Sequence, residues 1–198
     1  IWEIDLRITT LRLAALMAVT IGTSTWAAPQ PHYDAEAIRL NNRGVALMGQ
    51  QFTDRAAKAF TESFIKDPRL AQAAINKGIA LMALQKLPEA EEALKAALKL
   101  QPDDPQAWYN LGLAQHANNE TDAALASFGQ AVKYDPRDAD SFYFAGVCLS
   151  EMRKFDESIG MFKKALSIQP LHASSEFAMA RSLQRSGDTP DAKLHFKI

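Results

Sequence analysis

The chain contains a single cysteine, Cys148, among its 198 residues, so no disulfide can form within it. A lone cysteine in a helical apolar stretch is usually a small buried hydrophobe, and we expect Cys148 to be one. An excess of charge of one sign is also missing, because 22 lysines and arginines and 23 acidic residues leave a net charge of −1. The composition therefore indicates neither the basic surface typical of nucleic-acid binding nor an acidic tail.

The residue patterns of catalytic and cofactor sites are missing as well. The sequence has no glycine-rich phosphate loop, and no serine lies in a G-x-S-x-G stretch. None of its four histidines has a second ligand at metal-binding spacing on one helix face. They are His32, His116, His172 and His195. We therefore expect no enzymatic activity, no metal, no cofactor and no small-molecule substrate.

Residues 1–27 have the layout of a secretory signal peptide. Two arginines precede an uncharged run, residues 13–22, which is shorter than the roughly 20 apolar residues that a membrane helix needs. Small residues before the end of this segment favour cleavage after Ala27. Acidic residues near the start depart from the pattern, so an uncleaved anchor and an ordinary helix are the alternatives. The segment predicts an exported protein of bacterial type, periplasmic or secreted, that touches a membrane only if the segment stays attached. Residues 28–36 would then be a linker.

Prolines recur along the rest of the chain at a fixed spacing of 34 residues, at Pro68, Pro102, Pro136 and Pro170. A constant period of this length is the signature of stacked repeat units. Taking each unit to end two residues after its proline divides the chain into 37–70, 71–104, 105–138, 139–172 and a partial unit, 173–198. We treat residues 37–198 as one repeat domain.

Each unit contains two helical patterns separated by a short polar break. The patterns predict first helices at 36–49, 71–84, 105–117, 139–151 and 173–185, and second helices at 53–66, 88–100, 121–134, 155–168 and 190–198. The repeated prolines end the second helices, since proline lacks an N–H and disfavours helical conformation in the residue before it. We expect Thr53 and Thr121 to act as helix N-caps. We also expect Pro88 and Pro190 to lie in first helical turns, and Gly187 to end a helix at positive φ.

A small residue recurs at one place of each first helix and at one place of each second helix. The two sets are Gly44, Gly78, Gly112, Gly146 and Ala180, and Ala56, Ala90, Ala124, Ser158 and Ala192. Without side-chain bulk at these places, the two helices of a unit can approach closely, and larger side chains fill the remaining space.

The third unit shows the full pattern best, with Trp108, Leu111, Gly112, Ala124, Phe128, Ala131 and Pro136. These residues and their spacing resemble the tetratricopeptide repeat (TPR). Gln115 departs from the family pattern, which usually has an aromatic residue there, and Arg43 and Lys77 depart at a usual leucine place. The resemblance implies an all-α solenoid of antiparallel helix pairs in a right-handed superhelix, with four full units and one partial unit. It also implies a concave groove lined mainly by the first helices.

Three asparagines, Asn42, Asn76 and Asn110, stand one unit apart in successive first helices. In the family this place faces the groove, so the resemblance implies a ladder of amides that contacts the backbone of a bound peptide. An amide both donates and accepts, and can therefore pair with an extended chain of any sequence. Alternatively, the same amides bond within the array and fix its geometry.

Apolar and aromatic residues complete the groove that the resemblance implies: Ile75, Ile79, Tyr109, Leu113, Tyr143, Val147 and Phe177. Exposed apolar surface on this scale marks a binding site, although residues 28–36 or a downstream domain could cover it instead. A chaperone-type clamp for a C-terminal carboxylate is not expected. Of the places that would form one, only Asn76 fits, and the basic residues are missing.

The sequence therefore predicts a scaffold or adaptor that binds a protein or peptide segment in its groove. The alternative is that the chain is the non-catalytic N-terminal region of a larger exported protein, with the active domain beyond residue 198. The closing stretch, residues 186–198, resembles the way some exported bacterial TPR regions lead into β-propeller or ASPIC/UnbV-type domains.

Overall fold

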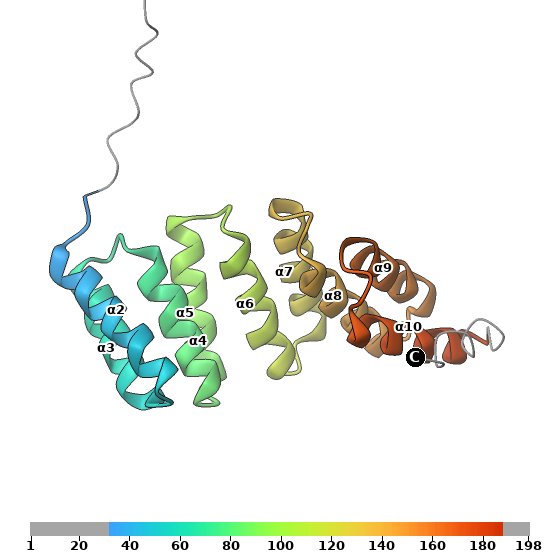
Figure 1. The fold of residues 1–198 in the computed structure, drawn as a ribbon, viewed down its shortest axis with the longest axis horizontal. Helices are drawn as coiled ribbons and strands as arrows, with labels where there is room; N and C mark the ends of the chain where they lie inside the picture. Colours follow the sequence, from blue (N-terminus) through green and yellow to red (C-terminus); the bar gives the residue numbers. More distant parts are fainter. Residues whose placement is uncertain (1–31, 188–198) are drawn as a thin grey trace, which may run out of the picture. The chain divides into compact units, whose positions relative to one another are not determined.

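The computed structural model describes residues 32–187, which form nine α-helices and no strand (Figure 1). The helices are α2 (Ala35–Gly49), α3 (Thr53–Lys66), α4 (Ala71–Ala83), α5 (Leu87–Leu100), α6 (Pro105–Ala117), α7 (Thr121–Tyr134), α8 (Ala139–Glu151), α9 (Phe155–Ile168) and α10 (Ala173–Ser186). Each begins and ends within one residue of its predicted bounds. The predicted signal peptide and the predicted helix 190–198 lie outside the described residues.

Helices that are consecutive in sequence pack side by side along the repeat region (Figure 1). The two helices of one unit, such as α6 and α7, make extensive contacts, and each second helix also packs on the next first helix. First helices of adjacent units touch as well, as α2 touches α4 and α8 touches α10. Among residues 32–187, the extensive contacts are those within a unit and between adjacent units, which is the arrangement of a repeat array. The prediction of an all-α solenoid of helix pairs is confirmed.

The recurring glycines of the first helices lie where a large side chain of the partner helix comes closest. A Cβ atom added at any of them would lie under 3.0 Å from a side-chain atom of the residue 16 positions later. The pairs and distances are Gly44–Phe60 at 2.4 Å, Gly78–Leu94 at 2.6 Å, Gly112–Phe128 at 2.7 Å and Gly146–Phe162 at 2.6 Å. The predicted close approach of the two helices is confirmed.

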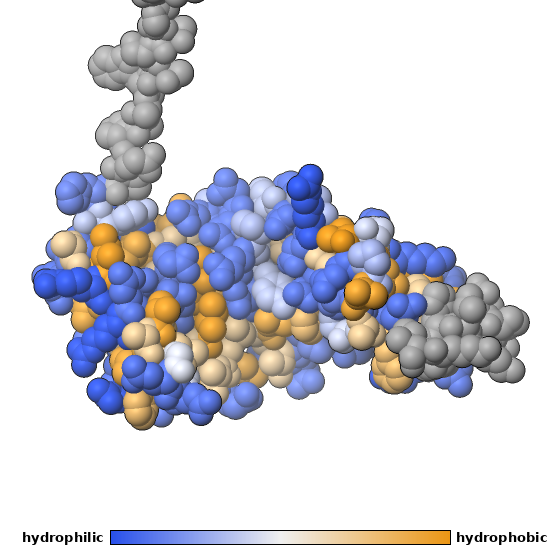
Figure 2. All heavy atoms as spheres, in the orientation of Figure 1, coloured by the Kyte–Doolittle hydropathy of each residue, from blue (hydrophilic) through white to orange (hydrophobic). Residues whose placement is uncertain are grey.

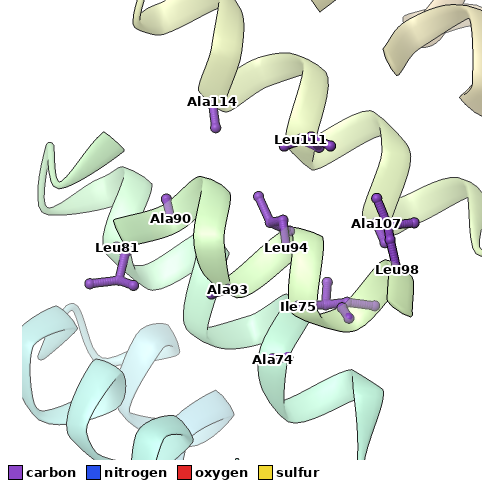
Figure 3. Close-up of a cluster of buried hydrophobic side chains, with 11 residues drawn as sticks. Ala74, Ile75, Leu81, Ala90, Ala93, Leu94, Leu98, Ala107, Leu111 and Ala114 are labelled. Carbon is purple, nitrogen blue, oxygen red and sulfur yellow. The ribbon is translucent and has the colours of Figure 1, made fainter. Parts of the chain in front are cut away.

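The core runs from one unit into the next and is rich in alanine. The α5 side chains Ala90, Leu94 and Leu98 face α6, which contributes Ala107, Leu111 and Ala114, and all of them are buried (Figure 3). Fully burying a leucine or phenylalanine stabilises a fold by about 1.5–3 kcal/mol, and the small alanines allow the helix axes to come close enough for that contact. Because the cluster joins two units, neither unit buries its apolar face alone.

Cys148 of α8 belongs to another buried cluster of this core. Its side chain is fully buried beside Ala124, Phe128 and Ala145. Burial raises the pKa of the thiol to about 12, and the nearby carboxylate of Glu151 adds to that rise. The expectation of a small buried hydrophobe is confirmed, and the thiol is protonated at neutral pH.

The turn inside each unit places one residue in the left-handed region of backbone conformation. The residues and their φ angles are Gln51 (63°), Gln85 (59°), Asn119 (62°), Arg153 (62°) and Gly187 (98°). After each of the first four, the following N–H donates to a carbonyl five residues back, as Lys86 does to Leu81 at 2.9 Å. This is the Schellman pattern that ends a helix. The prediction for Gly187 is confirmed, and four larger residues adopt the same conformation.

The same turn explains why the predicted threonine N-caps are wrong. Thr53 and Thr121 are the first residues of α3 and α7, and no side chain caps either helix. One residue after the left-handed Gln51 comes Phe52, which takes the N-cap position before Thr53, and its carbonyl accepts the first helical hydrogen bond, from Ala56. Pro88 lies in the first turn of α5, as predicted.

Side-chain caps occur instead at the start of first helices. Asp34, Asp104 and Asp138 each accept a backbone N–H in the first turn of the helix that follows.

Among residues 32–187, no helix is long and apolar enough to cross a lipid bilayer.

Candidate functional site

The first helices carry three rows of residues, each with one member every 34 residues, that together form what we call the first-helix face. The apolar row is Val45, Ile79, Leu113 and Val147, followed by Arg181. The amide row is Asn42, Asn76 and Asn110, followed by Phe144 and Ala178. The third row is Asn41, Ile75, Tyr109, Tyr143 and Phe177. These rows contain every residue predicted for the groove.

The apolar row keeps part of its surface in contact with solvent in each of the four full units. Val45 is 52% exposed, and Ile79, Leu113 and Val147 are half-buried. The exposed apolar residues are spread along the repeats rather than gathered at one point, and Figure 2 shows apolar side chains interspersed among hydrophilic ones on the face in view. A repeated, partly exposed apolar row can contact an extended partner along its length.

Two of the three amides are hydrogen-bonded within the array. Asn76 Nδ2 donates to Asn41 Oδ1 at 2.8 Å, and Asn76 Oδ1 accepts from Gln72 at 3.1 Å. Asn110 is buried and donates to the backbone carbonyl of Gln106, one turn earlier in its own helix, at 2.7 Å. Such bonds agree with the alternative interpretation of the amide row, in which the asparagines bond within the array and hold its geometry. Asn42 is exposed on α2 and stays a predicted ligand contact.

The third row changes from buried to exposed along the array. Ile75, predicted to line the groove, has no exposed surface and belongs to the core. It lies in α4, which is covered by first helices on both sides, since α4 contacts α2 and α6. Phe177 of α10 is 55% exposed. The prediction of an Ile75 pocket is therefore wrong, whereas Phe177 is at the surface as expected.

The predicted anchors Tyr109 and Tyr143 are half-buried in a cluster of aromatic rings. Tyr109 lies 5.9 Å from Phe144 between ring centroids, and Tyr143 lies 5.0 Å from the same ring and 5.9 Å from Phe162. Burial raises the pKa of Tyr109 to about 12, with smaller contributions from two carboxylates of α8 and its N-cap. Phe144 takes the next place in the amide row, so the amides stop where this cluster begins.

Two histidines pair with carboxylates of α8. His116 of α6 contacts Glu151 of α8, with 3.0 Å between Nε2 and Oε1. His172, just before α10, contacts Asp140 of α8 at 3.1 Å and also Ser175. The part of the chain that the structure describes holds no group of three or more potential metal ligands. The His116 contact joins two units, and the His172 contact joins α8 to the residue that caps α10.

A pocket of about 330 Å³ opens between α8 and α10. Its lining residues are Tyr143, Val147, Ser150, Glu151, Phe162, Ser174, Phe177, Ala178, Arg181 and Arg185. Three of these were predicted, but the two arginines were not. The sequence could have indicated Arg181 as a residue of this site, because it stands 34 residues after Val147 and is the one charged member of an otherwise apolar row.

These features define a helical-repeat scaffold with a partly apolar face on its first helices and one mixed pocket near the end of that face. The family model of the tetratricopeptide repeat matches three overlapping stretches, residues 41–93, 75–128 and 117–173. The chain therefore belongs to the tetratricopeptide repeat family. No curated protein matches it in a sequence search.

Solved structures of other repeat proteins resemble the chain over most of their length. A crystal structure of MamA has a TM-score of 0.76 at 23% identity, covering 82% of this chain and 88% of that one. MamA residues 41 to the end, from Desulfovibrio magneticus RS-1, give 0.77 at 21% identity, covering 83% and 93%. YrrB, described as a TPR protein with an unusual peptide-binding site, gives 0.69 at 20% identity, covering 80% and 82%. At these identities the likeness shows the fold alone.

Proposed function

We propose that the protein is a non-catalytic scaffold that binds an extended peptide segment of a partner protein along its first-helix face. The observation that carries the proposal is the apolar row, which stays partly exposed in four consecutive units, from Val45 to Val147. Burying such a row against a partner removes apolar surface from water at about 25 cal/mol per Å². The peptide-binding site attributed to YrrB supports the same use of this fold.

The polar groups of the face add contacts that do not depend on the partner's sequence. Asn42 is exposed, and the side-chain amides of Gln72 and Gln106 lie on exposed residues one turn before the amide row. An amide side chain can donate to a peptide carbonyl and accept from a peptide N–H. A partner in extended conformation offers both groups at regular intervals.

The proposal is tested by selecting binders from a random peptide library displayed on phage and measuring their affinity by fluorescence anisotropy. Val45→Glu and Leu113→Glu place a charge in the apolar row, and each should weaken binding by about tenfold or more. The matched control is Ile65→Glu, which changes a 73% exposed residue of α3, outside the first-helix face, in the same way. Equal affinities for Val45→Glu, Ile65→Glu and the unchanged protein would refute binding at this face.

We also propose that the protein is exported. The support is the signal-peptide layout of residues 1–27, which lie outside the described part of the structure. Mass spectrometry of the native polypeptide tests this: a product that begins at Ala28 is the expected result. Recovery of residues 1–27 on the native protein would count against cleavage.

A further inference from the structure

We propose that the pocket between α8 and α10 binds one large apolar side chain of an acidic peptide segment, whose carboxylates contact Arg181 and Arg185. This inference rests on the proposed function and names the chemistry of the partner at one end of the first-helix face. It is carried by the floor of the pocket, the charges on its rim and the neutrality of the rest of the face.

The floor of the pocket is apolar. Tyr143, Val147 and Ala178 are half-buried and pack against the cluster that contains the fully buried Phe162. The volume of about 330 Å³ is near the lower end of the roughly 300–1,000 Å³ typical of ligand pockets. The pocket thus suits a single phenylalanine, leucine or similar side chain rather than a broad protein surface.

The rim of the pocket is basic. Arg181 and Arg185 stand one helical turn apart on α10, and both are exposed. Within residues 32–187, neither forms an ion pair with a carboxylate. The Arg181 guanidinium lies 5.9 Å from the centre of the Phe177 ring, which favours a fixed position beside the pocket. A guanidinium can bind a carboxylate through two parallel hydrogen bonds.

One acidic residue, Glu151, also lines the pocket, but its carboxylate is engaged elsewhere. Its two oxygens lie 3.0 and 3.1 Å from His116 Nε2, and one of them lies 3.5 Å from Thr121 Oγ1. Both partners belong to the preceding unit. The arginines therefore face the pocket with their charge available to a ligand, whereas Glu151 is held toward α6 and α7.

The charge at this end of the face sets the direction of the bound segment. The apolar row is uncharged in α2, α4, α6 and α8 and becomes Arg181 in α10. The amide row is uncharged in all five units. Within the three rows of the first-helix face, a basic residue occurs only in α10, so an acidic residue of the partner that contacts these rows gains an ion pair at that end, and its carboxylates fix the register of the segment along the face.

The experiment compares three N-acetylated peptides, Gly-Asp-Phe-Asp-Gly, Gly-Asn-Phe-Asn-Gly and Gly-Asp-Gly-Asp-Gly, by NMR titration of the ¹⁵N-labelled full chain. The first should bind about tenfold more tightly than either of the others, because it alone offers both the ring and the carboxylates. Its shift changes should be centred on α8 and α10, and its affinity should fall as salt is raised. Equal affinities for the three peptides would overturn the inference.

Variants then assign the effect to the rim. Arg181→Gln with Arg185→Gln should abolish the preference for the acidic peptide, whereas Glu151→Gln should preserve or strengthen it. The control is Arg137→Gln, which removes the same charge from an exposed residue of the α7–α8 loop and should change nothing. Loss of the preference in Arg137→Gln to the same extent would show a general charge effect and overturn the inference.

Two further outcomes separate this inference from the proposed function. If library-selected peptides lose binding to Val45→Glu but carry no acidic residue and ignore the Arg181 and Arg185 changes, the scaffold function stands and the inference fails. If sedimentation shows a dimer that blocks the pocket and dissociates in the arginine variant, the occupant is a second copy of the chain, and the inference also fails. Binding of no peptide from the library, at any part of the face, would count against the proposed function itself.

Discussion

The ring of Phe128 in α7 occupies the space that a Cβ atom on Gly112 of α6 would need. The nearest ring atom would lie 2.7 Å from that Cβ, closer than real contacts of this kind. The ring itself is fully buried and packs against the rings of Tyr109 and Phe144, with centroid distances of 6.0 and 5.5 Å, so a shift of the ring would disturb both contacts. The same relation recurs between α2 and α3 and between α8 and α9.

Gly112→Ala should therefore destabilise the fold, although alanine is the better helix former. Overpacking a filled core costs about 1–3 kcal/mol, which outweighs the roughly 0.5–1 kcal/mol that alanine gains over glycine inside a helix. The free energy of unfolding, measured with urea, should fall accordingly. The matched control is Gly129→Ala in α7, where an added Cβ meets no atom within 4 Å. The control should be more stable than the unchanged protein, and a stabilised Gly112→Ala would contradict the packing argument.

The turn residues with positive φ predict a gain in stability. A residue with a Cβ atom in the left-handed region costs roughly 1–2 kcal/mol, and Gln85 and Arg153 adopt φ angles of 59° and 62°. A glycine at the same place removes that cost, but it also makes the unfolded chain more flexible, which cancels part of the gain in stability. Gln85→Gly and Arg153→Gly should each raise the free energy of unfolding by about 0.5–1 kcal/mol.

The control for this prediction is a glycine substitution at Gln50, the residue before the left-handed Gln51. Gln50 has a φ of −93°, which any residue adopts, so Gln50→Gly should give no gain or a small loss. Equal effects at Gln50 and at the left-handed positions would mean that the turn conformation is not the cause.

Asp67 predicts how stability depends on pH. Its carboxylate is 3% exposed and accepts from the Arg69 guanidinium at 2.9 Å and from the Asp34 backbone N–H at 2.9 Å. These bonds, with Arg69 the larger cause, hold the pKa of Asp67 well below its usual range. They link the start of α2 to the loop between α3 and α4.

Because the pKa is lower in the folded state, the contribution of Asp67 is complete above the ordinary pKa of an aspartate, about 3.9. It is lost as pH falls below that value. Asp67→Asn should lower the thermal midpoint at pH 7, and the gap between the two proteins should narrow as the pH is lowered toward 3. Asp54→Asn, an exposed change in α3, is the control. A gap that stays constant over this range would show that the charge of Asp67 is not responsible.

The sequence allowed the helix bounds to be predicted because every unit repeats the same local signals. Pro68 and its equivalents mark the ends of the second helices, and Gly44 and its equivalents mark where two helices approach. Such features depend on neighbours within one unit. By contrast, the burial of Ile75 depends on how α4 is covered by the helices of other units. A repeat period alone does not specify how the helices of other units bury a given side chain.

The same limit applies to the candidate site. The bond between Asn76 and Asn41 joins two units and two different rows, so the spacing that singled out Asn76 could not reveal its partner. The α8–α10 pocket likewise depends on the placement of one first helix against the next. Phe177 and Val147 were predicted because they continue rows, whereas Arg185 belongs to no row that the pattern had identified.

A buried polar pair within the third unit predicts strong coupling between two substitutions. Gln115 stands where the other units have Leu47, Leu81, Leu149 and Leu183, and its Oε1 accepts a hydrogen bond from Ser127 at 2.6 Å. Both side chains are buried. Ser127→Ala alone should cost about 1–3 kcal/mol, because it leaves the Gln115 carbonyl oxygen without a partner. Adding Gln115→Leu should recover most of the lost free energy of unfolding, since replacing both partners by apolar groups is nearly neutral. Urea unfolding of the two single variants and the double variant measures the coupling, and strictly additive effects would show that the pair does not act as a unit.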